Sequence, residues 1–177
     1  MKTLEFYVKE IREERLNLHD IQVPPTEIGL EIEEVRFVKP IDGHIQLSRH
    51  VQDVYVKANC STWVEVECRR CVEPFETEVE TDIEVEFRPQ DESKPIDPLL
   101  VDAGERYYSE DCIDLSEEAR QAITLEIPIW PLCAESCKGL CLHCGENLNI
   151  AACDCKPPET VYSPFAGLAD LLEMRET

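Results

Sequence analysis

The clearest pattern along the chain is a strict alternation of two kinds of side chain over residues 75–87. Every even position in this run is a carboxylate, and every odd position is apolar or threonine. A period of two places the two sets on opposite faces of a β-strand. The carboxylates are Glu76, Glu78, Glu80, Asp82, Glu84 and Glu86. We therefore predict a strand with one face on a core and a row of like charges on the other.

Shorter apolar runs earlier in the chain predict further strands. We expect an opening strand over residues 4–8 and several strands between residues 31 and 68, joined by turns. Asp42-Gly43 is one of the turn signals in this part of the chain. Residues 90–98 combine prolines with charges, which predicts a loop after the charged strand.

One helix is predicted before the cysteine-rich part of the chain. Residues 116–127 place mostly apolar side chains at helical spacing, and Asp114 or Ser116 can cap the first turn. Pro128 follows the pattern and ends it. The stripe consists of Leu115, Ala119, Ala122, Ile123 and Glu126. It indicates a helix that buries one side.

A second amphipathic helix is predicted over residues 163–174, near the end of the chain. Its buried side consists of Phe165, Leu168, Leu171 and Leu172. We therefore expect an α+β fold: a strand-rich antiparallel body with one central helix, a cysteine-rich zinc-knuckle loop and a short C-terminal helix. Residues 1–130 form the body and residues 131–177 the knuckle segment with its closing helix, within one compact unit.

Six of the ten cysteines lie between residues 133 and 155, spaced as C-x3-C-x3-C-x2-C followed by C-x-C. Thiolates at such short gaps wrap one tetrahedral ion at bond lengths of about 2.3 Å. The fragment Cys141-x2-Cys144-Gly145 is the most specific, because the glycine lets backbone amides turn toward the sulfurs. The candidate zinc ligands are Cys133, Cys137, Cys141, Cys144, Cys153 and Cys155. We expect a structural zinc ion here.

The choice of four ligands from these six stays open. Cys141 and Cys144 need two partners, and either the upstream or the downstream pair can supply them. Six thiolates are too few for two separate four-cysteine sites, so we expect two to be left over. His143 is expected to be exposed between the knuckle cysteines and not to be a ligand.

A separate C-x2-C pair, Cys68 and Cys71, encloses two arginines. Three interpretations compete: half of a second metal site, a redox pair whose thiolates the arginines favour, or one site shared with Cys141 and Cys144. A redox pair normally follows a strand and opens a helix, and no such context is predicted here. We favour a structural or metal-linked turn. The two remaining cysteines, Cys60 and Cys112, are expected to be small buried hydrophobes.

The net charge of −21 restricts the choice of partner. So acidic a surface repels a phosphate backbone and suits a basic protein. The row of carboxylates is either a solvated face or a docking surface for such a partner.

The first residues are too polar for the apolar core of a signal peptide, and no run of about 20 apolar residues predicts a membrane helix. We expect a cytoplasmic protein with reduced thiols and no membrane contact.

Catalytic patterns are absent from the sequence. The four histidines are scattered, with no HExxH spacing, and there is no Gly-x4-Gly-Lys-Ser/Thr loop. We therefore expect neither an enzyme nor a small-molecule substrate. The alternative is a thiol redox or metal-sensing protein that uses Cys68 and Cys71.

Several segments together resemble the landmarks of one family. They are Asp114-Leu115, Glu126-Ile127-Pro128, Cys133-x3-Cys137-Lys138-Gly139-Leu140-Cys141-x2-Cys144-Gly145-x-Asn147-Leu148-Asn149, Cys153-x-Cys155, Cys68-x-Arg70-Cys71-x-x-Pro74 and Ser163-Pro164-Phe165-Ala166-Gly167-Leu168. This arrangement, over residues 30–172, resembles the YceD family, also called large ribosomal RNA subunit accumulation protein. Some members of that family lack most of the C-terminal cysteines, which implies that the metal is a structural support.

The resemblance implies a bacterial or plastid factor that large-subunit ribosomal RNA needs in order to accumulate. Our hypothesis is a non-catalytic ribosome-biogenesis factor for the 23S RNA. Because the chain is acidic, we expect it to meet the RNA indirectly, through a ribosomal protein or assembly factor of basic character.

Overall fold

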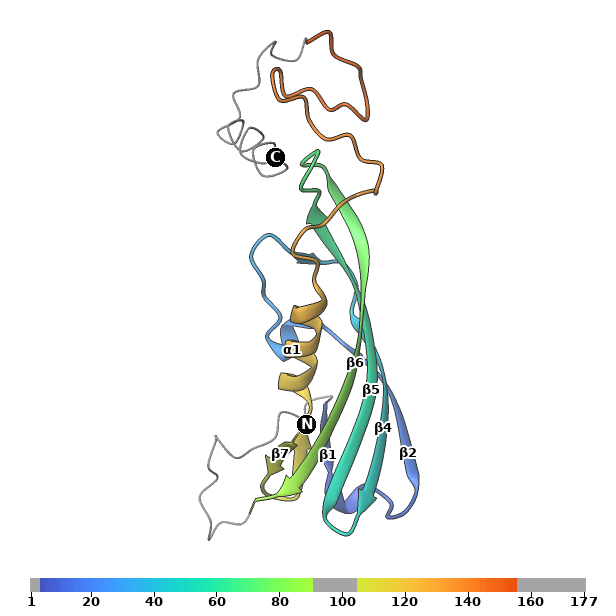
Figure 1. The fold of residues 1–177 in the computed structure, drawn as a ribbon. Coiled ribbons are helices and arrows are strands. Elements are labelled where there is room, and N and C mark those ends of the chain that lie inside the picture. The colour runs from blue at the N-terminus through green and yellow to red at the C-terminus, as the bar shows by residue number, and fades with distance from the viewer. Residues whose placement is uncertain (1–3, 91–104, 156–177) are drawn as a thin grey trace, which may run out of the picture.

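The central element of the fold is one long, twisted sheet (Figure 1). The computed structural model describes residues 4–90 and 105–155. In these residues the strand order is β2-β4-β5-β6-β7, and β3 also pairs with β5. All neighbours are antiparallel except β6 and β7, which are parallel. The strands are β2 (Leu16–Val23), β3 (Arg36–Phe37), β4 (Ile41–His50), β5 (Asp53–Glu67), β6 (Pro74–Pro89) and β7 (Glu105–Tyr108).

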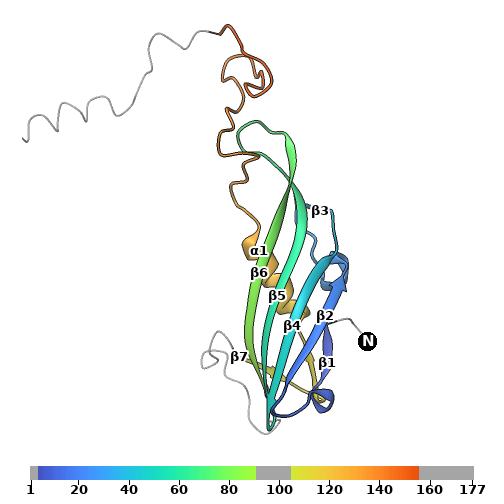
Figure 2. The same ribbon diagram turned by 90° about the vertical axis from the view of Figure 1, so that its right-hand side faces the viewer.

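Smaller elements complete the body. The predicted opening strand is β1 (Glu5–Tyr7), which pairs with β8 (Cys112–Asp114). Two short 3-10 helices follow β1 and β2, at Val8–Glu10 (η1) and Pro25–Ile28 (η2). The helix α1 (Ser116–Glu126) covers one face of the sheet, and no described element covers the other (Figures 1 and 2). None of the helices in residues 4–90 and 105–155 has the length and apolar character that crossing a bilayer requires.

Strand β6 confirms the alternation read from the sequence. Its odd-numbered side chains from Val79 to Phe87 are buried against the core. The carboxylates at the even positions are exposed, except Glu86, which is half-buried. The row of like charges therefore lies on the uncovered face of the sheet.

The turn predicted at Asp42-Gly43 is wrong, because both residues lie inside β4. Gly43 pairs with Ile21 of β2. A Cβ atom at Gly43 would lie 2.8 Å from Cγ1 of Ile21. The glycine is therefore needed for close side-chain packing between neighbouring strands, and not for a change of chain direction.

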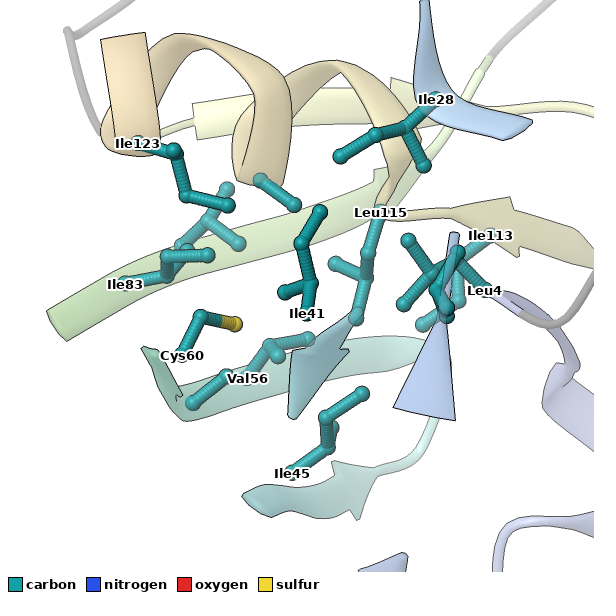
Figure 3. Close-up of a cluster of buried hydrophobic side chains, with 14 of the residues drawn as sticks. Leu4, Ile28, Ile41, Ile45, Val56, Cys60, Ile83, Ile113, Leu115 and Ile123 are labelled. Atoms are coloured by element: carbon teal, nitrogen blue, oxygen red, sulfur yellow. The ribbon is translucent and has the colours of Figure 1, made fainter. Parts of the chain in front are cut away.

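The predicted helix is confirmed as α1, within one residue of its expected end. The N-cap residue is Leu115, which makes no side-chain capping bond, so neither Asp114 nor Ser116 holds the predicted cap position. Asp114, one residue earlier, accepts a hydrogen bond on its Oδ1 from the backbone N–H of Ser116 at 2.8 Å. Leu115, Ala119 and Ile123 are buried, and they pack with side chains from the sheet (Figure 3). The last member of the predicted stripe, Glu126, is exposed.

The described part is thus strand-rich with one main helix, as predicted, although β7 makes the sheet mixed and not wholly antiparallel. The helix predicted over residues 163–174 lies outside the described residues, as does most of the loop predicted over residues 90–98. The β5–β6 hairpin extends well beyond α1, and residues 131–155 lie around and beyond its tip (Figures 1 and 2). This placement brings two distant groups of cysteines together.

Candidate metal centres

Eight cysteines form two groups of four, and within each group all four sulfur atoms lie within 4.8 Å of one another. We call the first group the hairpin cluster, because two of its members lie in the turn between β5 and β6. The second group, the loop cluster, comes from one short segment of the chain. The hairpin cluster consists of Cys68, Cys71, Cys133 and Cys137, and the loop cluster of Cys141, Cys144, Cys153 and Cys155.

The spacing of the sulfur atoms fits a tetrahedral ion. Cys68 Sγ lies 3.8 Å from Cys137 Sγ, and Cys71 Sγ lies 3.7 Å from Cys133 Sγ. Four ligands at about 2.3 Å around one tetrahedral centre lie about 3.8 Å apart. A disulfide would instead bring two sulfurs to about 2.05 Å. Both clusters therefore have the ligand type and number of a site that can hold a metal ion.

The turn of the hairpin cluster has a characteristic backbone pattern. The N–H of Cys68 donates to the carbonyl of Glu73 at 3.0 Å, and the N–H of Val72 donates to the carbonyl of Cys68 at 2.8 Å. Val72 has a φ of 59°, in the left-handed region. This conformation is unusual for a β-branched residue, so the turn is held by its surroundings.

The first turn of the loop cluster repeats this pattern. The N–H of Cys141 donates to the carbonyl of Glu146 at 2.8 Å, and the N–H of Gly145 donates to the carbonyl of Cys141 at 2.9 Å. Gly145 has a φ of 76°, which a glycine adopts without steric cost. The two C-x2-C turns are thus built alike, although their sequences share only the cysteines and a glutamate.

Burial distinguishes the two clusters. Cys68, Cys71 and Cys137 are all buried, with Phe75, Leu132 and Leu140 packed against them. In the loop cluster, Cys144 and Cys155 are exposed. Three of the four hairpin-cluster thiols are therefore part of a small core, with Cys133 exposed, whereas the loop cluster lies at the surface.

The arginines between Cys68 and Cys71 hold the following segment in place. The backbone N–H of Arg69 donates to the carbonyl of Pro131 at 2.9 Å. Nη1 of Arg70 donates to the carbonyls of Glu135 at 3.0 Å and Cys137 at 2.9 Å. These bonds bring the chain after α1 back to the hairpin turn.

Hydrogen-bond donors lower the pKa of two thiols in the hairpin cluster, Cys68 and Cys137, and of Cys141 in the loop cluster. Burial opposes ionisation of Cys68, but backbone N–H groups, first that of Cys133, outweigh it and lower its pKa to about 6. Backbone N–H groups of Cys144 and His143 lower the pKa of Cys141 to about 6. The two arginine side chains are not among the causes for Cys68. The backbone therefore stabilises a thiolate in each cluster, which is the form that binds metal.

In each cluster, other thiols resist ionisation while no cation is present. The pKa of Cys133 is raised to about 12 by burial and by its contacts with Cys137 and other thiols of the hairpin cluster. Hydrogen bonding with Cys144, followed by burial, raises the pKa of Cys155 to about 12. Four thiolates at this spacing repel one another, so full ionisation of either cluster requires a bound cation.

The predicted ligands are divided between the two clusters. Cys133 and Cys137 join the hairpin cluster, while Cys141, Cys144, Cys153 and Cys155 form the loop cluster by themselves. The structure thus groups eight cysteines where we expected one site from six. His143 belongs to neither group and is exposed.

Sequence reasoning left Cys68 and Cys71 outside the zinc ligands. Of the three interpretations for this pair, the structure agrees with the first: the pair is half of a second four-cysteine group. Sharing a site with Cys141 and Cys144 is not observed. Both sulfurs also lie among other thiols in a buried position, which does not suit a redox pair that must meet a substrate. A usable signal was present in the repeated fragment C-x2-C-x-Glu.

The two isolated cysteines behave differently. Cys60 is buried in the main core, as expected, and burial raises its pKa to about 11. Cys112 is only half-buried. Neither belongs to a cluster.

A pair of glycines offers a test of how closely the segments are packed. Gly139 and Gly145 both have a φ of 76°, so alanine at either costs about 1–2 kcal/mol. Only at Gly139 would the new Cβ lie 3.0 Å from the carbonyl oxygen of Arg70, which accepts a hydrogen bond from Leu140. We expect Gly139→Ala to lower the melting temperature of the metal-loaded protein more than Gly145→Ala. Equal losses in differential scanning calorimetry would contradict this packing.

A comparison with protein families identifies the chain. The family model described as "Large ribosomal RNA subunit accumulation protein YceD" matches residues 56–172, more than half of the 177 residues. The match includes both clusters. The chain belongs to the YceD family. The description of this family names an accumulation factor and not an enzyme.

Curated relatives include two plant proteins named chloroplastic YCED homolog 1. The Arabidopsis thaliana protein is 39% identical over 66 residues, which cover 36% of this chain and 21% of the relative. The Zea mays protein is 52% identical over 58 residues, covering 32% of this chain and 20% of the relative. The matched part of this YceD chain thus spans about a fifth of the length of these plant relatives.

A bacterial relative matches over a longer stretch. This uncharacterized protein of Mycobacterium leprae is 26% identical over 148 residues, covering 82% of this chain and 65% of the relative. No solved structure matches this YceD chain significantly.

Proposed function

We propose that the two clusters bind two structural zinc ions. Four thiolates in a tetrahedral arrangement favour zinc among the common metals, with iron as the other candidate. A closed set of four cysteines leaves no position for water or substrate, which is typical of a structural and not a catalytic zinc site. The ions would be held by Cys68, Cys71, Cys133 and Cys137 in one site and by Cys141, Cys144, Cys153 and Cys155 in the other.

The function that fits best is a non-catalytic ribosome-biogenesis factor that supports accumulation of large-subunit (23S) ribosomal RNA in the cytoplasm. The family match carries this proposal. The closed form of both clusters supports it, because neither offers an open position for catalysis.

Deletion of the gene tests this function directly. We expect the ratio of large- to small-subunit ribosomal RNA to fall, because the large-subunit RNA would not accumulate. Expression of the intact gene from a plasmid should restore the ratio. An unchanged ratio in the deletion strain would count against the proposed role.

The partner we propose is a basic ribosomal protein or assembly factor, which would bring the chain to the RNA indirectly. The supporting observation is the uncovered face of the sheet. Lys57 pairs with Glu84 at 2.8 Å and Arg88 with Glu86 at 2.7 Å at one end of the carboxylate row. Glu78 and Glu80 form no ion pair with a described residue, and their counterparts on β5, Trp63 and Ser61, are uncharged. The middle of the row can therefore pair with cations of a partner.

Charge reversal within the row tests this docking face. In a variant with Glu78→Lys, Glu80→Lys and Asp82→Lys, we expect binding to basic ribosomal proteins to weaken about tenfold or more at low salt. The loss should shrink as salt rises, because exposed charges are screened beyond about 8 Å at physiological ionic strength. Binding is measured by pull-down or by interferometry with purified ribosomal proteins.

A matched control places the same three charge reversals elsewhere. Glu10, Glu31 and Glu126 are exposed and lie outside the sheet, so their replacement changes the net charge equally. If both variants bind equally weakly, net charge alone is responsible, and the carboxylate row is not a docking face.

A further inference from the structure

The two clusters are joined by more than the chain between them. Only three residues separate Cys137 of the hairpin cluster from Cys141 of the loop cluster. The last of these, Leu140, donates its backbone N–H to the carbonyl of Arg70 at 3.0 Å and packs against the hairpin cluster. Leu140 also forms a β-bridge with Asn147. The segment that closes the loop cluster therefore lies against the hairpin cluster.

One polar side chain of this segment also reaches a sulfur atom of the hairpin cluster. Asn149 lies between the two cysteine pairs of the loop cluster, and its Nδ2 donates to Sγ of Cys137 at 3.3 Å. Its Oδ1 accepts the backbone N–H of Lys138 at 2.8 Å. Because a backbone N–H can only donate, this bond fixes which end of the carboxamide faces the sulfur. An amide donor is thus aimed at a ligand atom of the hairpin cluster.

The neighbouring asparagine holds Asn149 in this orientation. Asn147 Oδ1 accepts both the backbone N–H of Asn149 at 3.0 Å and its Nδ2 at 2.9 Å. Nδ2 of Asn147 contacts Oε1 of Glu73 at 3.4 Å, next to the hairpin turn. The backbone N–H of Leu148 donates to the carbonyl of Gly139 at 3.0 Å. Residues 147–149 therefore form a bridge from the loop cluster to the hairpin cluster.

We propose that the two metal sites are coupled, and that Asn149 is the positioning residue through which occupation of the loop cluster strengthens metal binding at the hairpin cluster. This inference rests on the proposed binding of two ions. An ion in the loop cluster fixes both flanks of residues 145–152, so Asn149 no longer loses conformational freedom when its amide meets the thiolate of Cys137. Hydrogen bonds from second-layer groups tune metal ligands in this way.

Site-specific occupancy tests the coupling. Protein loaded with cadmium, which replaces zinc at thiolate sites, should give one cadmium NMR resonance per four-thiolate site. The resonance missing in Cys144→Ser identifies the loop cluster. A chelator titration then measures retention of the ion in the hairpin cluster. We expect Cys144→Ser to lower the affinity of the hairpin cluster for its ion about ten- to a hundredfold. This factor corresponds to the free energy of a hydrogen bond to a charged group.

Variants of Asn149 separate the hydrogen bond from general damage. Asn149→Ala should weaken the hairpin cluster by a similar factor, and adding Cys144→Ser to it should have little further effect. Asn149→Asp keeps the acceptor for Lys138 but places a carboxylate beside Cys137, so it should weaken the site at least as much. Asn59→Ala is the control, because its amide bonds Asp82 on the exposed face of the sheet and contacts neither cluster. Circular dichroism confirms that each variant keeps the sheet.

Each outcome has a distinct meaning. Two ions in the wild-type protein, with unchanged hairpin retention in Cys144→Ser, would overturn the coupling and leave the two-site proposal intact. The wild-type protein could bind two ions, and Cys144→Ser could weaken the hairpin cluster as much in the Asn149→Ala background as in the wild-type background. That result would show that Asn149 does not link the two sites. Fewer than two ions in the wild-type protein would overturn the two-site proposal and the coupling together.

Discussion

Cys71→Ser is expected to leave the protein with no more than one bound zinc ion in place of two. Cys71 is a buried member of the hairpin cluster, and serine is a poor ligand for zinc at neutral pH. The apparent free energy of structural zinc binding, about 10–16 kcal/mol in small domains, rivals the whole stability of a typical domain. We therefore also expect the segment after Pro131 to lose protection against hydrogen exchange. Elemental analysis of protein purified under reducing conditions and exchange mass spectrometry measure the two effects.

The control for this experiment is Cys112→Ser. Cys112 is half-buried and belongs to neither cluster, so its variant should keep two ions and the wild-type exchange pattern. Retention of two ions by Cys71→Ser would show that the hairpin cluster does not hold the metal. Rapid oxidation of Cys68 and Cys71 to a disulfide in metal-free wild-type protein would favour the redox alternative.

Ile123→Ala is expected to lower the free energy of unfolding by about 2–5 kcal/mol. Ile123 is fully buried at 0% exposure, where α1 packs on the sheet (Figure 3). Removing its outer carbons leaves a cavity that the long strands beneath the helix cannot readily collapse to fill. Because the chain passes directly from α1 to the cysteine segment, a loosened helix should also release metal more readily. Denaturant unfolding of the metal-loaded protein measures the change in free energy.

Leu125→Ala provides a comparison on the same helix. Leu125 is 83% exposed, so its truncation should change the free energy of unfolding by no more than about 0.5 kcal/mol. Similar losses for the two variants would mean that α1 does not pack on the sheet as described.

The sequence was most informative where one local pattern determines one element. The alternation over residues 75–87 predicted both the strand and its buried face, because a period of two cannot fit a helix. The apolar stripe beginning at Leu115 and the proline that follows it predicted α1, because apolar side chains at helical spacing share one face of a helix. The glycine in Asp42-Gly43 misled us, because a glycine that avoids contact with Ile21 looks the same in sequence as a glycine in a turn.

The clusters were harder to predict because their members come from distant segments. Cys71 and Cys133 are 62 positions apart, and only the length of the β5–β6 hairpin brings its tip to the segment after α1. No local spacing contains that information. By contrast, the loop cluster lies within one short segment, and its four members were all among the predicted ligands.

An ion at the hairpin cluster would close the chain into a ring. A bridge between Cys71 and Cys133 encloses β6, β7, β8 and α1 within a span of 62 positions. By the chain-entropy relation for cross-links, a closed loop of that size restricts the unfolded chain by about 4 kcal/mol. A disulfide would provide the same restraint only where thiols can oxidise, whereas a zinc bridge also forms under reducing conditions. Loss of the ion would then open the ring without cleavage of the chain or of a disulfide. The concentration of available metal would therefore determine how strongly the segment from β6 to α1 is restrained.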